Sequence, residues 1–271
     1  MKKLFIYLFM VLSSLSMSAQ TIDVKGKSVP LDHFWSVGVG AGRVNEGLRA
    51  SWLEHLKESK KHCGFQYVRM HGLFCDDMCI YTERKNGDPV YNWQYVDDVY
   101  DRMLSIGVRP FVELSFFPKG IAADTTKIQM WYRNLVTPDR ERYGKWHDLV
   151  KAFTQHVVDR YGLDEVNKWY FEVWNEPDGV WCWKHGPDGG EYGEFVKATA
   201  AAIREGNPGA KVVGGSICLR DLGWLNDVLA TGAGKVMDFL TYHGYMPDEL
   251  EGADRVRAYR ALCARYNPAL R

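Results

Sequence analysis

Six short apolar runs alternate with six longer segments of helical periodicity, and this alternation constrains the fold more than any other feature of the sequence. Short runs that alternate with helical segments in one direction predict a parallel sheet covered by helices. The expected strands cover residues 34–40, 65–70, 109–116, 169–174, 211–215 and 237–242. The expected helices cover residues 47–61, 93–105, 139–161, 192–205, 221–229 and 253–266.

The strands are apolar on both faces, as strands of a buried parallel sheet are. No Gly-x-Gly-x-x-Gly follows the first strand, so a dinucleotide-binding fold lacks its signature. We therefore predict an α/β chain with a (β/α)8 TIM-type barrel, of which about six of the eight units are present. Residues 20–271 form the N-terminal part of this one domain.

Polar residues gather where the predicted strands end, which is where barrel proteins place their chemistry. Glu113 lies within the third strand and is expected to be structural. The other polar residues at strand exits are His71, Asn175, Glu176, His243 and Tyr245.

Glu176 stands at the exit of the fourth strand, in the segment 171–177, and Pro177 turns the chain directly after it. Cleavage of a glycoside needs one carboxyl to protonate the departing oxygen and another to attack or to activate water. Glu172 is not expected to be that second carboxyl. Four residues along a strand span ~13 Å at ~3.3 Å each, whereas a retaining pair needs about 5–5.5 Å. Glu172 is therefore predicted to be a structural carboxylate, hydrogen-bonded within the barrel.

The charge balance excludes some partners. Lysine plus arginine number 34 and aspartate plus glutamate number 34, so neither nucleic acid nor an anionic membrane surface is expected to bind. Cys75 and Cys79 are four residues apart, but no second Cys/His pair stands at zinc spacing. We predict no metal site and no cofactor, and we expect the six cysteines to be isolated buried thiols.

The first 19 residues have the features of a cleavable signal peptide. Lys2 and Lys3 precede an apolar run from Leu4 to Leu15, and small residues lead to a cleavage site after Ala19. The run is too short for a comfortable membrane span, so no stable membrane anchor is expected. The mature protein is predicted to be secreted or periplasmic.

Four blocks of sequence carry a resemblance to a known family. Together they extend over most of residues 34–245, and the chain resembles glycoside hydrolase family 39, which includes β-xylosidases and α-L-iduronidases. The blocks are Tyr67-Val68-Arg69-Met70-His71-Gly72-Leu73-Phe74-Cys75-Asp76-Asp77, Val108-Arg109-Pro110-Phe111-Val112-Glu113-Leu114, residues 171–177 and Tyr242-His243-Gly244-Tyr245.

The resemblance implies a retaining glycosidase, most similar to β-xylosidases, whose substrate is an oligosaccharide or other glycoside. Glu176 is its implied general acid/base. A general acid needs a raised pKa in the free enzyme, and the second carboxylate would supply part of that shift.

The resemblance also implies residues that bind the sugar. Asn175 would hydrogen-bond the sugar 2-hydroxyl, and His71 and His243 would line the subsite for the cleaved sugar. Tyr245 would hydrogen-bond the nucleophile. Trp183, past the fourth strand, would lie by the leaving group.

One departure from the family concerns the nucleophile, which in the family is a glutamate at the end of strand seven. The sequence ends at Arg271, after the sixth helix. We therefore expect a fragment that alone would be unstable or aggregate and would not turn over a glycoside, since two unpaired edges would remain.

Two other interpretations stay open. One is a carbohydrate-binding pseudoenzyme on the same barrel. The other is a non-hydrolytic barrel enzyme such as a lyase or isomerase, which would usually need a metal cluster or a phosphate-binding loop. The sugar, exo or endo action and the oligomeric state are not determined by the sequence.

Overall fold

The computed structural model describes residues 23–123, 128–129, 132–133, 140–183, 188–218, 221–245 and 249–270. The chain divides into two compact units, Met1–Phe34 and Trp35–Arg271. In the first unit, residues 23–26 form a turn in which Gly26 N donates to Asp23 O at 3.1 Å. The predicted signal peptide, residues 1–19, lies outside the described residues.

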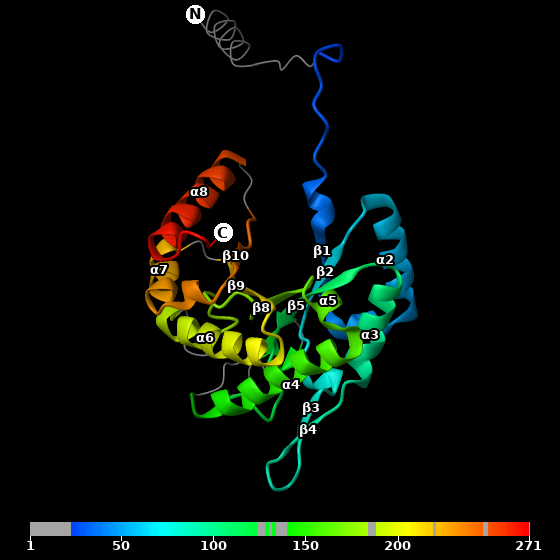
Figure 1. Cartoon of the computed structure of the whole chain (residues 1–271), viewed down its shortest axis with the longest axis vertical. Helices are drawn as coiled ribbons and strands as arrows, with labels where there is room; N and C mark the ends of the chain where they lie inside the picture. The colour runs from blue at the N-terminus through cyan, green and yellow to red at the C-terminus, as the bar shows by residue number, and fades with distance from the viewer. Residues whose placement is uncertain are drawn as a thin grey trace, which may run out of the picture. The chain divides into compact units, whose positions relative to one another are not determined.

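The second unit contains a six-stranded parallel sheet in the order β1-β2-β5-β8-β9-β10 (Figure 1). Each strand lies beside the previous one along the chain, as in a barrel that grows in one direction. This arrangement confirms the predicted α/β class. The strands of the sheet are β1 (Gly38–Arg43), β2 (Tyr67–His71), β5 (Arg109–Leu114), β8 (Tyr170–Val173), β9 (Lys211–Ile217) and β10 (Phe239–Tyr242).

Helices lie along the outer side of this sheet (Figure 1). Two of them begin at aspartate N-caps: Asp188 Oδ1 accepts from Glu191 N, and Asp221 Oδ1 accepts from Gly223 N. The α-helices are α2 (Ala50–Cys63), α3 (Gln94–Ser105), α4 (Tyr143–Tyr161), α5 (Leu163–Val166), α6 (Gly189–Gly206), α7 (Leu222–Ala230) and α8 (Glu249–Tyr266). The 3-10 helices are η1 (Phe34–Val37), η2 (Val44–Leu48), η3 (Asp76–Met78), η4 (Arg140–Arg142) and η5 (Ala233–Lys235).

The first strand differs from its prediction. Residues 34–37 form a 3-10 turn, and the strand runs from Gly38 to Arg43 instead of 34–40. The ladder with β2 begins where Gly38 pairs with Tyr67, so the apolar residues before Gly38 have no neighbouring strand to extend.

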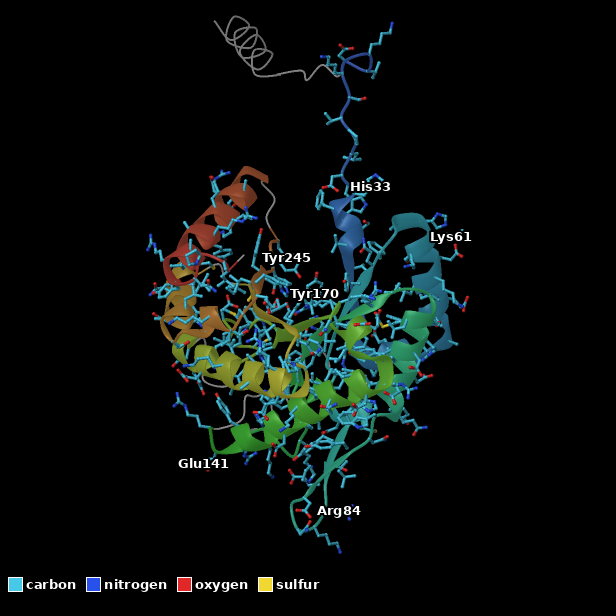
Figure 2. All side chains as sticks on the ribbon, viewed as in Figure 1. His33, Lys61, Arg84, Glu141, Tyr170 and Tyr245 are labelled. Atoms are coloured by element: carbon cyan, nitrogen blue, oxygen red, sulfur yellow. The ribbon has the colours of Figure 1, made fainter. Side chains whose placement is uncertain are left out.

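Two hairpins interrupt the alternation. The predicted turn at residues 86–89 belongs to an antiparallel hairpin of β3 (Tyr81–Glu83) and β4 (Pro89–Tyr91). Arg84 lies near the tip of this hairpin (Figure 2). A second hairpin pairs β6 (Ile128–Gln129) with β7 (Tyr132–Arg133); the neighbouring Trp131, in the predicted long loop, lies outside the described residues.

An aromatic layer fills the space between the sheet and its helices. Trp146 and Phe195 stack at 5.4 Å between ring centroids, and Phe74 meets Trp146 edge-on at 5.5 Å. Phe117 contacts Trp174 at 4.5 Å. These side chains are fully buried, and such edge-to-face pairs add to the free energy gained from their burial.

All six cysteines are free. Cys75, Cys182 and Cys263 are buried, but Cys63 and Cys79 are exposed, so the expectation of buried thiols is wrong for these two. Cys63 is the last residue of α2, and Cys79 follows a 3-10 turn with a φ of 53°. In both places the chain turns at the surface. Among the helices that the structure describes, each is too short or too polar to cross a membrane.

Candidate active site

The sheet curves, so side chains from distant strands meet inside it. Arg69 on β2 donates to Ser216 Oγ on β9 at 3.0 Å. In a flat sheet these strands, three positions apart, would be separated by ~14 Å at ~4.8 Å per strand. Curvature therefore brings the polar residues of β2, β5, β8 and β9 to one interior.

A buried charge network occupies this interior. Arg69 Nε donates to Glu172 Oε2 at 2.6 Å, and Arg69 Nη2 lies 2.7 Å from Glu113 Oε2. Both carboxylates are buried. Burial opposes the charged form of each group, but the carboxylates outweigh it and raise the pKa of Arg69. Burial likewise opposes ionisation of Glu113, yet Arg69 and His71 lower its pKa.

Glu172 also accepts a hydrogen bond from the β10 strand. Thr241 Oγ1 donates to Glu172 Oε1 at 2.6 Å, while Ser216 N donates to Thr241 Oγ1 at 2.9 Å. Glu113 accepts from the hydroxyl of Ser115. The prediction that Glu172 is hydrogen-bonded within the barrel is confirmed, and Glu113 is tied into the same network.

Glu176 stands at the exit of β8 in an unusual backbone conformation. Its φ is 47° and that of Trp174 is 74°, both in the left-handed region that favours glycine. Two such residues in one turn store backbone strain, which is often found at functional sites. The carbonyl of Glu176 accepts from Gly179 N at 3.0 Å, which closes the turn.

Both carboxyl oxygens of Glu176 have nitrogen partners. His243 Nδ1 lies 2.8 Å from Oε1, and Trp181 Nε1 donates to Oε2 at 2.6 Å. The hydrogen bond with His243 is the main cause of a lowered pKa of Glu176; burial opposes it, and Trp181 and His71 act in the same direction as His243. The sequence predicted a raised pKa. These nitrogen groups outweigh burial, so the direction is opposite to the predicted one.

Two predicted sugar-binding residues lie between the network and Glu176. Asn175 is buried; its Oδ1 accepts from Arg69 Nη2 at 3.0 Å and its Nδ2 contacts Cys182 Sγ at 3.7 Å. His71 Nδ1 lies 2.7 Å from Glu113 Oε2, and its ring stacks near Phe116 at 6.4 Å. Arg69 and Glu113 therefore set the orientation of Asn175 and His71.

His243 follows β10, and its backbone N donates to Ile217 O at 2.8 Å. Tyr245 lies just beyond the end of this strand and is 84% exposed (Figure 2). Its ring meets that of His243 edge-on at 6.4 Å. The structure thus brings His71, Asn175, Glu176 and His243 together, with Tyr245 at their margin.

Trp183 is placed differently from the other predicted residues. Only 2% of it is exposed, and it packs edge-on against Trp174 and Phe195 in the core. The indole beside Glu176 is that of Trp181, which sequence reasoning did not single out. The sequence places both tryptophans after the same strand, but their spacing alone does not say which side chain points back to Glu176.

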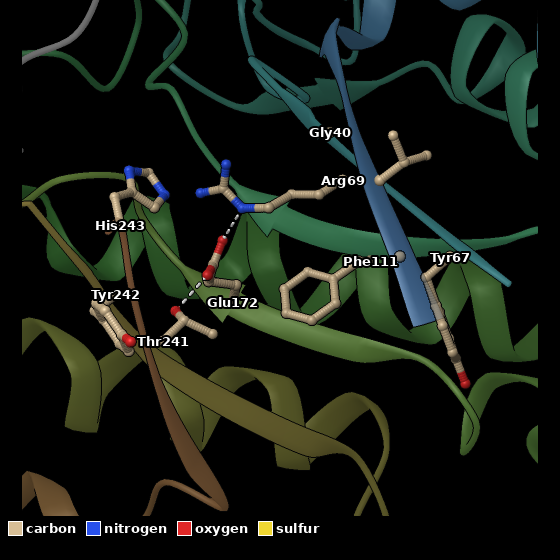
Figure 3. Close-up of a pocket in the computed structure, with 10 residues that line it drawn as sticks. Gly40, Tyr67, Arg69, Phe111, Glu172, Thr241, Tyr242 and His243 are labelled. Atoms are coloured by element: carbon tan, nitrogen blue, oxygen red, sulfur yellow. Dashed lines mark hydrogen bonds and ion pairs between the residues drawn. The ribbon is translucent and has the colours of Figure 1, made fainter. Parts of the chain in front are cut away.

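A cavity of about 280 Å³ lies beside His243 and the charge network of Arg69 and Glu172 (Figure 3). Arg69, Glu172, Thr241 and His243 are among its polar lining residues, and Tyr242 belongs to its wall. Its lining comes from both edge strands, β1 and β10, so it opens between the two ends of the curved sheet. A mainly apolar cavity with a few polar side chains, the carboxyl of Glu172 among them, can hold a small ligand such as a sugar ring. Within the described ranges, no three His, Cys, Asp or Glu side chains gather as a metal ligand set.

Comparison with known proteins gives a family. The profile of glycosyl hydrolases family 39 matches residues 20–267. A β-xylosidase from Geobacillus stearothermophilus is 39% identical over 216 residues, which is 78% of this chain and 42% of the relative. A β-xylosidase from Caldicellulosiruptor saccharolyticus is 32% identical, over 84% of this chain and 46% of the relative.

Comparison with solved structures agrees with this family. The crystal structure of a monomeric β-xylosidase from Caulobacter crescentus superposes with a TM-score of 0.79 at 29% identity, covering 90% of this chain and 52% of the other. The chain thus spans about half the length of the relatives that it matches.

Proposed function

The chain belongs to glycosyl hydrolases family 39, and from this membership we propose that it carries the acid/base side of a retaining glycosidase site for β-xylosides. The observation that carries the proposal is Glu176, at a strained strand exit, with a nitrogen partner on each carboxyl oxygen; one of these partners, His243, also lines the cavity. Similarity to two β-xylosidases supports the choice of sugar.

The proposed reaction has two steps. A second carboxylate attacks the anomeric carbon while Glu176 protonates the departing oxygen, which gives a glycosyl-enzyme. Glu176 then takes a proton from water, and the water displaces the carboxylate with net retention. No metal or redox cofactor is needed for this sequence of steps.

The neighbouring residues have proposed roles in binding. His71 and His243 line the subsite for the cleaved sugar, and Asn175 presents its amide to the 2-hydroxyl. Asn175 Oδ1 accepts from Arg69 and one Nδ2–H points to Cys182 Sγ, so the second Nδ2–H is the group proposed to donate to the sugar. Tyr245 orients the second carboxylate.

The second carboxylate is proposed to come from a part of the family's domain that this chain does not span. The relatives extend well beyond the matched region, since 78% of this chain corresponds to 42% of the first. A second carboxylate placed near Glu176 would raise the pKa of Glu176 and let it hold a proton. We further propose export, directed by residues 1–19.

A second candidate function is a carbohydrate-binding protein without turnover. The hold on Glu176 favours it, because His243 and Trp181 stabilise its charged carboxylate and so oppose its use as a proton donor. Binding of xylose with no hydrolysis would support this function and contradict the first.

The test compares the 271-residue chain with the product of the longest open reading frame of its gene. Each is assayed on 4-nitrophenyl β-D-xyloside and on an alkyl β-D-xyloside, with Glu176→Ala and the surface control Glu54→Ala. We expect Glu176→Ala to lose about 10²–10⁴-fold on the alkyl substrate, which needs a proton, and much less on the nitrophenyl one. Added azide should restore turnover of the nitrophenyl substrate, whose leaving group needs no proton, and give a xylosyl azide of retained configuration. Equal loss on both substrates, or an inverted product, would contradict the proposal.

A further inference from the structure

Trp181 covers the outer carboxyl oxygen of Glu176. Its indole Nε1 donates to Glu176 Oε2 at 2.6 Å, although 47% of the residue is exposed. A hydrogen bond to an ionised carboxylate is stronger than one between neutral groups. This tryptophan therefore contacts the group that must meet a leaving group.

Gly179 makes room for the indole. A Cβ at this position would lie 2.5 Å from Trp181 Cε2 and 2.9 Å from Nε1, closer than real atoms approach. Gly179 is not among the glycines with positive φ, so its backbone does not require glycine. The absence of a side chain is instead what lets Trp181 fold back over the turn.

The loop that carries Trp181 is anchored at its two ends. Glu176 O accepts from Gly179 N at 3.0 Å, and Cys182 O accepts from Trp174 Nε1 at 3.0 Å. Between these anchors, Val180 and Trp181 are both exposed. The side chain can therefore move without any change in the strand.

The two partners of Glu176 differ in how firmly they are held. His243 directly follows β10 and is tied to Ile217 by a backbone hydrogen bond. Trp181 lies on the loop with half its surface in solvent. An incoming oxygen needs one of the two carboxyl oxygens, and Trp181 is the partner that yields more easily.

We propose that Trp181 is a positioning residue that holds Glu176 through its indole N–H in the empty site and leaves Oε2 when a leaving-group oxygen arrives. The contact with Glu176 stands on the geometry alone; the displacement by a leaving group rests on the proposed glycosidase function. An N–H donor stabilises the carboxylate, so its departure raises the pKa of Glu176 and favours the protonated acid.

The first test is a titration of the full-length gene product by NMR, with ¹⁵N-labelled tryptophan and ¹³C-labelled glutamate. We expect one indole N–H signal, absent in Trp181→Phe, to titrate with the carboxyl of Glu176 and to stop titrating in Glu176→Gln. Trp181→Phe should raise the pKa of Glu176. Gly179→Ala, which pushes the indole away without removing it, should raise it in the same direction.

The matched controls are Trp52→Phe on α2 and Gly144→Ala on α4, where an added Cβ meets nothing within 4 Å. Neither should change the pKa of Glu176. An indole signal that does not titrate with Glu176 would overturn the proposal, whether or not the protein hydrolyses glycosides. So would a pKa of Glu176 that is unchanged in both Trp181→Phe and Gly179→Ala.

The second test adds the leaving group. If the full-length product turns over, Trp181→Phe should shift the alkaline limb of its kcat/KM–pH profile, which reports the general acid, upward. It should also change KM for different aglycones more than kcat for a common glycosyl group. A binding-only ligand, xylose, should leave the indole signal in place, whereas a xyloside with a bulky aglycone should move it. An indole that stays on Glu176 with the xyloside bound would refute the displacement.

Discussion

Glu172 and Glu176 are four residues apart at the end of one strand, yet they occupy opposite environments. The side chain of Glu172 is 1% exposed and is held by Arg69 and Thr241, whereas that of Glu176 is 19% exposed and is held by a histidine and a loop tryptophan. The inner carboxylate has partners from rigid strands. The outer one has partners that can change.

This difference shows where protonation can be used for chemistry. A buried ion pair is costly to break because the remaining charge stays uncompensated, so Arg69 and the two inner carboxylates hold one another in place. Glu176 lies where solvent and small movements alter its hydrogen bonds, so its proton affinity is adjustable. In the proposed function, the inner network is the frame and Glu176 is the carboxyl that exchanges a proton.

The largest expected effect comes from breaking the frame. Arg69→Met leaves Glu113 and Glu172 buried without their cation, and we expect a loss of about 3–5 kcal/mol in the free energy of unfolding. Chemical denaturation monitored by circular dichroism measures it. Arg109→Met removes a more exposed pair with Glu165 and should cost clearly less. Similar losses in the two variants would mean that the network is not the frame proposed here.

A smaller effect is expected beneath the strand exit. The buried hydroxyl of Tyr192 donates to Val173 O at 2.6 Å and accepts from Gly215 N at 3.1 Å, so it joins β8 to β9 below Glu176. Tyr192→Phe removes the hydrogen-bond partner of these two backbone groups. We expect it to lower the free energy of unfolding, measured with denaturant, by about 1–3 kcal/mol. Tyr95→Phe on exposed α3 serves as the control. No difference between the two variants would show that water replaces the hydroxyl.

The pH dependence of stability tests the outer carboxyl. The folded-state pKa of Glu176 lies below its ordinary value of 4.5, so its stabilising contribution is present above that value and is lost as pH falls through the folded pKa. The free energy of unfolding should therefore fall more between pH 6 and pH 3 in the wild type than in Glu176→Gln. Glu54→Gln should match the wild type. A steeper fall in Glu176→Gln would mean that the pKa is raised instead.

The smallest effect is expected for an exposed ion pair. Lys57 Nζ lies 2.9 Å from Glu54 Oε1 on α2, and both side chains are largely in solvent. Lys57→Ala should change the free energy of unfolding by no more than about 0.5 kcal/mol. A change as large as that of Tyr192→Phe would remove the contrast between buried and exposed polar contacts.

Much of the fold could be predicted from local patterns. The helix expected at 93–105 is observed as Gln94–Ser105, and the strand expected at 169–174 as Tyr170–Val173, because apolar periodicity and chain breakers act over neighbouring residues. The start of β1 could not be predicted, since it depends on which residue of β2 stands opposite.

The site was predicted in part for the same reason. Strand exits identified His71, Glu176 and His243, which the structure brings together. Arg69 was overlooked as the centre of the network, because its role depends on three other strands. Trp181 and Trp183 could not be told apart, because side-chain direction in an irregular turn does not follow sequence spacing.

The sequence by itself determined the order of strands and helices, the family and the residue types at the strand exits, since these depend on periodicity and on motifs contiguous in the chain. Only the tertiary structure decided which charges are paired, which tryptophan reaches Glu176 and in which direction its pKa moves. Those properties depend on distances of a few ångströms between residues far apart in the chain, and on how much water each group loses.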